Sequence, residues 1–117
     1  MFELMVEETF DSAHALRKYE GPCENLHGHT WKVQVFLAGK KLNRIGLLED
    51  FKSIRKELKI IIDTFDHQFL NDLAAFTKKN PTSENIAQTI YKKLKKRFRL
   101  LTKVTVWESA TTYASYY

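Results

Sequence analysis

Two stretches of the chain have the alternating hydrophobic and polar positions of β-strands. Residues 2–10 contain β-compatible residues with some alternation, and residues 29–38 alternate more clearly. In a strand, every second side chain points to the same face of the sheet. One face of the second stretch carries Trp31, Val33, Val35 and Leu37. Both stretches are therefore predicted to be strands, and Gly39 is predicted to end the second one.

The middle of the chain has apolar residues at helical spacing. Asp50 can cap a first helix, whose apolar positions are Phe51, Ile54, Leu58, Ile61, Ile62 and Phe65. Asn80-Pro81 then interrupts the chain, and Thr82 or Ser83 can cap a second helix. The inward-facing residues of the second helix are predicted to be Ile86, Ala87, Ile90, Tyr91, Leu94 and Phe98.

The last part of the chain returns to a strand pattern. Val104, Val106 and their neighbours predict a third strand, and residues 113–117 predict a short fourth one. The resulting order ββααββ favours an α+β fold, with an antiparallel four-stranded sheet and two helices on one of its faces. Such a sheet has two open edges, and because pairing between subunits is one way to cover them, an oligomer is expected.

Length and composition restrict the class of protein. The chain has 117 residues, which predicts a single domain spanning residues 1–117. Hydrophobic residues make up 44% and aromatic residues 13%, as in a globular protein. No apolar run has the length of a membrane span, and the N-terminus is acidic where a signal peptide is basic. The single cysteine, Cys23, fits a reducing compartment, so a cytoplasmic protein without a membrane partner is expected.

The formal net charge of +5 adds little to this description. Many of the basic residues lie on the second predicted helix, interleaved with apolar ones: Lys92, Lys93, Lys95, Lys96, Arg97 and Arg99. This arrangement is typical of a solvated helix face, so no nucleic-acid partner is predicted.

Three histidines form the strongest candidate site. His27-Gly28-His29 opens the second strand, so both imidazoles point to the same face. His14 ends the first strand and comes close to them if the two strands are neighbours. Three neutral imidazoles suit Zn²⁺ and leave a fourth coordination position for water or substrate, as in catalytic zinc sites. The alternative is that these are three unrelated polar residues, and we favour the metal because of their spacing.

Cys23 precedes His27 with three residues between them, in a polar loop. A thiol beside a metal ion and a histidine has a lowered pKa and can serve as a base or nucleophile. Cys23 could instead be a fourth zinc ligand, which would close the site and make it structural. The sequence leaves both roles open.

Two acidic motifs have both a functional and an ordinary explanation. Asp66-His67 follows the first long helix, where a carboxylate can orient a histidine as a proton shuttle, or the histidine can simply meet the helix dipole. Glu108 lies late in the third strand, where its carboxylate can accept two hydrogen bonds from a guanidine-like edge or can face solvent.

Together these motifs resemble the 6-pyruvoyl-tetrahydropterin synthase and 6-carboxy-tetrahydropterin synthase family. The resemblance runs nearly end to end and includes residues 10–14, 23–29, 66–67, 81–85 and 107–109. It implies the tunnelling fold (T-fold), whose subunits assemble into barrels, commonly as a homo-hexamer of two trimers. It assigns zinc binding to His14, His27 and His29. It assigns catalysis to Cys23 as the base, with Asp66 and His67 as a relay. It assigns pterin contacts to Glu108, Thr82 and Ser83.

The loop before His27 is similar to that of the 6-carboxy-tetrahydropterin branch, which serves queuosine and other deazapurine synthesis. The resemblance therefore implies a zinc-dependent lyase that converts 7,8-dihydroneopterin triphosphate to 6-carboxy-tetrahydropterin, acetaldehyde and triphosphate. Arg17, Lys18 and Arg44 are candidates for attracting the triphosphate. The alternatives are a 6-pyruvoyl product, or a module that binds a pterin or a metal without turnover.

Overall fold

The computed structural model describes residues 1–18 and 25–117. Its strands and long helices are β1 (Phe2–His14), β2 (His27–Gly39), α1 (Phe51–Phe65), α2 (Ser83–Lys95), β3 (Leu101–Ser109) and β4 (Thr112–Tyr116). Two short 3-10 helices, η2 (Leu70–Asp72) and η3 (Ala74–Phe76), lie between α1 and α2. The order ββααββ that the sequence predicts is confirmed.

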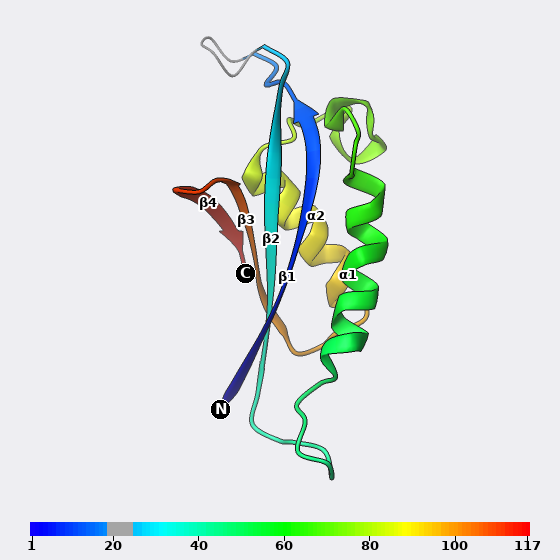
Figure 1. Ribbon diagram of the computed structural model, residues 1–117, viewed down its shortest axis with the longest axis vertical. Coiled ribbons are helices and arrows are strands. Elements are labelled where there is room, and N and C mark those ends of the chain that lie inside the picture. The colour runs from blue at the N-terminus through cyan, green and yellow to red at the C-terminus, as the bar shows by residue number, and fades with distance from the viewer. Residues whose placement is uncertain (19–24) are drawn as a thin grey trace.

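The four strands form one antiparallel sheet in the order β1-β2-β3-β4. Both long helices lie on the same face of this sheet (Figure 1). The pairing of β1 with β2 runs without a break from Phe2 opposite Gly39 to His14 opposite His27. Both strands extend beyond the alternating stretches at residues 2–10 and 29–38, and the far end of the hairpin carries His14 at the end of β1 and His27 at the start of β2.

The hydrophobic core lies between the sheet and the helices. The alternating residues of β2, Trp31, Val33, Val35 and Leu37, are all buried, as predicted. The helices contribute Ile54, Leu58, Ile61, Ile62 and Phe65 from α1 and Ile86, Ala87, Ile90 and Leu94 from α2. Burying a large apolar side chain contributes about 1.5–3 kcal/mol, so this face sets the orientation of both helices. Phe51 is an exception because it is 53% exposed, and the apolar face of α1 begins one turn later.

Both long helices begin at capping side chains. The Asp50 carboxylate accepts a hydrogen bond from the backbone N–H of Lys52 at 2.8 Å. The Thr82 hydroxyl oxygen accepts one from the backbone N–H of Asn85 at 3.1 Å. Thr82 rather than Ser83 is therefore the cap of α2. No helix in the described part of the chain is long and apolar enough to cross a membrane.

The connection after α1 covers the outer edge of β1 near its C-terminal end. The backbone N–H of His67 donates to the carbonyl of Asp11 at 2.6 Å, and the N–H of Ala13 donates to the carbonyl of Gln68 at 3.1 Å. Ala13 and Phe69 form a short parallel bridge. This part of the edge is therefore paired within the chain, which fixes the end of β1 from both sides.

Candidate metal centre and active site

The end of the β1–β2 hairpin brings the three histidines together on the helix-facing side of the sheet. His14 lies opposite His27, and Ser12 lies opposite His29. Since alternate residues share a face, His14, His27 and His29 all continue the face that carries Trp31. The Trp31 ring packs nearly perpendicular to the rings of His14 and His29, with its centroid 4.8 and 5.3 Å from theirs. The three histidines that the sequence predicts to lie close together are therefore neighbours, with the Trp31 ring packed against two of them.

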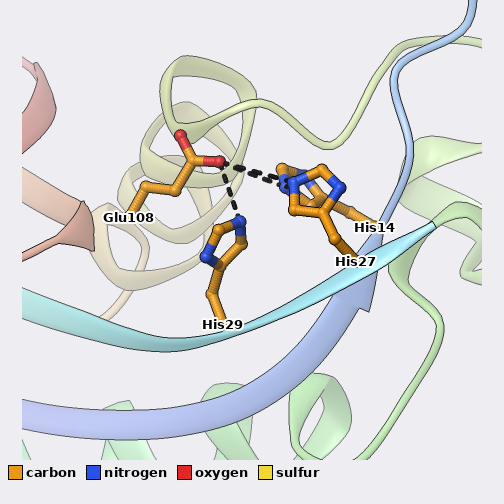
Figure 2. A group of neighbouring side chains, drawn as sticks. All are labelled: His14, His27, His29 and Glu108. Atoms are coloured by element: carbon orange, nitrogen blue, oxygen red, sulfur yellow. Dashed lines mark hydrogen bonds and ion pairs between the residues drawn. The ribbon is translucent and has the colours of Figure 1, made fainter. Parts of the chain in front are cut away.

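The Nε2 atoms of the three imidazoles and one carboxylate oxygen converge on one point (Figure 2). The Nε2 atoms of His14 and His27 are 2.9 Å apart. The Oε1 atom of Glu108 lies 3.2 Å from Nε2 of His14, 3.1 Å from that of His29 and 4.0 Å from that of His27. Donor atoms about 2 Å from a tetrahedral zinc ion would lie about 3.3 Å from one another, so these spacings fit such an ion.

Hydrogen bonds at the outer ring nitrogens select the metal-binding tautomer. Nδ1 of His14 lies 2.8 Å from the carbonyl oxygen of Pro81, and Nδ1 of His27 lies 2.7 Å from that of Asn25. A carbonyl oxygen only accepts, so each Nδ1 carries the proton and donates it. Each Nε2 is thereby left with a lone pair aimed at the centre of the group, which is the arrangement found around metal-bound histidines.

Burial favours the neutral form of His14 and His29. Removal from water lowers the pKa of His14 and of His29 below the usual value of histidine, although the nearby Glu108 carboxylate opposes the shift. Nε2 of His29 is buried and has no hydrogen-bond partner among residues 1–18 and 25–117, although Oε1 of Glu108 lies 3.1 Å away. A buried polar nitrogen without a partner is costly. A bound cation would satisfy this nitrogen, so the donor set fits a metal of the zinc type.

Glu108 reaches this group from β3. It is one residue past Trp107, which pairs with Lys32, and it therefore points to the helix-facing side of the sheet. From the sequence, this carboxylate could either accept hydrogen bonds from a guanidine-like edge or face solvent. The structure places the carboxylate at the fourth corner of the histidine group, where it can bind a metal, and also beside a pocket, where it can meet a ligand.

The pocket beside Glu108 has a volume of about 200 Å³. It lies between the start of α2 and the β3–β4 hairpin, and its lining residues are Ser83, Glu84, Glu108, Thr112, Tyr113 and Ala114. Ser83, for which the resemblance implies a pterin contact, lines this pocket, whereas the Thr82 hydroxyl oxygen caps α2. Sequence reasoning missed Thr112 as a lining residue. It also missed the carbonyls of Pro81 and Asn25, because a main-chain carbonyl that accepts a hydrogen bond from a histidine can belong to any residue type.

Asp66 and His67 form a second group, separate from the three histidines within the chain. Nδ1 of His67 is 3.0 Å from a carboxylate oxygen of Asp66, and the His67 side chain is largely exposed. The hydrogen bond from the backbone N–H of Asp11 is the main cause that lowers the pKa of Asp66, and the bond to His67 adds to it. His67 has φ 55°, a left-handed conformation that turns the chain sharply after α1. The pair is thus an ionised carboxylate holding an accessible imidazole.

The remaining predicted site residues are placed as follows. Cys23 lies outside the described residues. The Arg17 guanidinium donates hydrogen bonds to two backbone carbonyls, those of Asn71 at 3.1 Å and Lys79 at 3.3 Å. Arg44 follows Gly39, at the opposite end of the hairpin from His14. Within one chain, Arg44 is therefore too far from the histidines to attract a phosphate bound there.

Comparison with known proteins gives a consistent result. The sequence profile of the family described as 6-pyruvoyl tetrahydropterin synthase matches residues 3–117. A Haemophilus influenzae protein named 6-carboxy-5,6,7,8-tetrahydropterin synthase is 33% identical over 141 aligned positions, covering 99% of both chains. A Pyrococcus furiosus protein named dihydroneopterin monophosphate aldolase is 32% identical over 108 positions, covering 90% of this chain and 88% of its own.

The fold agrees with these similarities. The structure of Caenorhabditis elegans 6-pyruvoyl tetrahydropterin synthase superposes with a TM-score of 0.90 at 29% identity, covering 98% of this chain and 94% of the other. The subunit therefore has the T-fold that the resemblance implied. The chain belongs to the 6-pyruvoyl tetrahydropterin synthase family of lyase-type enzymes.

Proposed function

We propose that the chain, as a single domain of residues 1–117, is a zinc-dependent 6-carboxy-5,6,7,8-tetrahydropterin synthase. It converts 7,8-dihydroneopterin triphosphate and water to 6-carboxy-tetrahydropterin, acetaldehyde and triphosphate, and it serves queuosine or other deazapurine synthesis in the cytoplasm. The observation that carries the proposal is the group of three imidazoles, whose Nε2 lone pairs converge beside a carboxylate and a pocket. The name of the Haemophilus influenzae relative supports the choice of branch.

His14, His27 and His29 would hold the zinc ion. When bound, zinc acts as a Lewis acid that lowers the pKa of hydroxyl groups on the substrate side chain. Burial lowers the pKa of His14 and His29 and so favours their neutral, metal-binding form at neutral pH. The two carbonyl partners at Pro81 and Asn25 hold the rings in orientation before the metal arrives.

Glu108 would bind the amino-pyrimidine edge of the pterin. The 2-amino group and the adjacent ring N–H present two parallel donors, and an ionised carboxylate can accept both. Ser83 lies across the pocket from Glu108, at the first turn of α2, where backbone N–H groups and a hydroxyl are available to a carbonyl oxygen. Thr82 would act from the same turn, with its oxygen already holding the cap. The pocket next to the metal group thus has the chemistry for a pterin.

Cys23 would serve as the base that moves protons between the substrate side chain and the ring. The role rests on the family resemblance and on three residues separating Cys23 from His27. Asp66 and His67 would complete the proton relay, with the carboxylate of Asp66 fixing the His67 ring. Because this pair stands apart from the three histidines within the chain, it would act where the assembly brings it to a neighbouring copy's site.

A homo-hexamer of two trimers is the assembly we propose. The outer edge of β4 and the N-terminal part of β1 are the two edges of the sheet. Edge pairing between copies would close the sheets into a barrel and would remove both edges. No nucleic acid and no membrane is part of the proposal.

One assay tests the proposed reaction. The purified, zinc-loaded protein is given 7,8-dihydroneopterin triphosphate, and the products are identified by mass spectrometry together with an acetaldehyde assay. The 6-carboxy product with acetaldehyde supports the proposal. A 6-pyruvoyl product would move the protein to the sister reaction, and turnover of the monophosphate alone would assign the aldolase reaction of the Pyrococcus furiosus relative. No turnover of either substrate by a metal-loaded protein would leave a binding module.

A further inference from the structure

We propose that Asn71, Asn80 and Arg17 form a clamp that positions His14 for metal binding. This inference rests on the proposed function, because it assigns a purpose to residues outside the metal group. None of the three residues contacts the convergent point of the imidazoles. The three residues act on the metal group indirectly, by holding the backbone around His14 and the loop that carries the Pro81 carbonyl.

The first part of the clamp is a pair of asparagine side chains that imitate a neighbouring strand. The Asn71 amide accepts a hydrogen bond from the N–H of Ala15 at 3.0 Å and donates one to the carbonyl of Ala15 at 2.8 Å. The Asn80 amide makes the same two bonds with Arg17, at 2.9 and 3.0 Å. A side-chain amide has one donor and one acceptor in the geometry of a peptide group, so each asparagine replaces one residue of a strand.

These bonds continue a pattern that begins inside β1. Asp11 and Ala13 pair with the backbone around His67 and Gln68, and Ala15 and Arg17 pair with the two asparagines. Every second residue from 11 to 17 is thus held on its outer side by the α1–α2 connection. His14 lies in the middle of this run and is the last residue of β1, so the clamp continues the outer pairing past this proposed metal ligand.

The second part of the clamp holds the loop whose Pro81 carbonyl bonds to the His14 ring. The Arg17 guanidinium donates to the carbonyls of Asn71 and Lys79, which ties the two ends of the connection together. The Asn80 carbonyl accepts a hydrogen bond from the Asn85 side chain at 2.8 Å, which anchors it to α2. Pro81 comes next in the chain, and its carbonyl holds Nδ1 of His14 at 2.8 Å. The same loop therefore fixes both the backbone and the imidazole of His14.

The chemistry of these groups favours a positioning role over contact with substrate. Asn71 is only 8% exposed, and both polar atoms of its amide are already bonded. The Arg17 guanidinium donates to neutral carbonyls of its own chain. A guanidinium held in this way orients a loop, whereas a triphosphate-binding arginine would direct the same N–H groups at the ligand. The clamp thus gives Arg17 a different role from that of a triphosphate contact.

The test compares the zinc affinity of Asn80→Ala and Arg17→Ala with that of the wild type, by competition with a chelator. Loss of a group that orients a metal-bound histidine lowers metal affinity about 10–100-fold, so we expect about tenfold weaker binding in both variants. Asn43→Ala is the matched control. The Asn43 side chain also accepts from main-chain N–H groups, at 3.0 Å from Ile45 and Leu47, but it lies past the opposite end of the hairpin. Its zinc affinity should stay within twofold of the wild type.

Two further measurements separate the possible failures. If Arg17 bound the triphosphate, Arg17→Ala would raise the KM for the substrate and leave zinc affinity unchanged, which would overturn the clamp. Folded variants with wild-type zinc affinity would overturn it as well. If Asn80→Ala does not fold, Asn80→Asp replaces it, because a carboxylate keeps the acceptor and loses the donor.

If the wild type binds no zinc, the proposed metal is wrong. The clamp is then tested by ¹⁵N NMR of the His14 ring. The wild type should show only the tautomer with the proton on Nδ1, whereas Arg17→Ala should show an average of the two tautomers. The Nδ1–H tautomer alone in both proteins would refute the clamp.

Discussion

Replacing Thr82 separates the role of a helix cap from that of a substrate contact. The Thr82 oxygen accepts a hydrogen bond from the N–H of Asn85 at 3.1 Å and is the cap of α2. Loss of such a cap costs about 1 kcal/mol of unfolding free energy. For a chain of 117 residues, this change lowers the melting temperature by about 4 °C. We therefore expect Thr82→Ala to melt about 4 °C below the wild type, and Thr82→Ser to recover most of the difference because serine keeps the oxygen.

The metal-free protein is the correct material for this measurement, because zinc binding would add its own stabilisation. Thermal unfolding is followed by circular dichroism for the wild type and both variants, and the KM for the pterin substrate is measured on the zinc-loaded proteins. Since Thr82 follows Pro81, whose carbonyl holds His14, a loosened cap should also weaken zinc binding slightly. An unchanged melting temperature together with a raised KM in Thr82→Ala would refute the cap argument and leave substrate contact as the role of Thr82.

Three other consequences follow from the site. Burial lowers the pKa of His14 and His29 in the folded state, so the unfolded chain binds more protons once the pH falls below about 6.5. The unfolding free energy of the metal-free protein should therefore be constant above that pH and should decrease below it; denaturant titrations that show no decrease between pH 7 and 5 would contradict this. Glu108→Gln should raise the KM for the pterin at least about tenfold, because a neutral amide cannot accept two charge-assisted hydrogen bonds. A loss of zinc affinity with an unchanged KM would instead make Glu108 a metal ligand. Finally, co-expressed His67→Ala and His14→Ala subunits should recover part of the activity that each variant lacks alone, since the two groups are separate within a chain. No recovery in verified mixed oligomers would place both groups in the site of a single chain.

The histidine group was predictable because it depends on strand periodicity alone. Once β1 and β2 pair as a hairpin, His27 and His29 must share a face, and His14 needs only the correct register to join them. Three neutral imidazoles are ligands that suit a transition-metal ion, and zinc is the ion that we propose. The same periodicity predicted the buried residues of β2, which are all found in the core.

The length of β1 was not predictable in the same way. Residues 11–14 are polar or small and have weak β-propensity, so the hydrophobic pattern of the strand is recognisable only up to residue 10. The structure extends it because Ser12 is buried against the Phe65 carbonyl, which its hydroxyl bonds, and because the α1–α2 connection pairs with the outer edge. These are contacts between segments more than 50 residues apart. No local pattern shows such contacts.

The position of Glu108 and the role of Arg17 illustrate the same limit. The sequence shows an acidic residue in a strand, but only the register of β3 on β2 shows that it meets the histidines. Arg17 was a candidate for a phosphate contact, and the structure adds that its guanidinium donates to main-chain carbonyls, which any residue type could supply. The sequence therefore indicates which chemistry each side chain can perform, but it does not indicate which groups that side chain contacts in the fold.

Zinc titration of the chelator-stripped protein tests the central claim most directly. The account predicts one tightly bound zinc ion per chain, and a large loss of affinity in the variants His14→Ala, His27→Ala and His29→Ala, each of which removes one converging Nε2 atom. Circular dichroism would confirm that the variants remain folded. Failure of the wild type to bind zinc, or unchanged binding by the variants, would contradict the claim that these histidines form the metal centre.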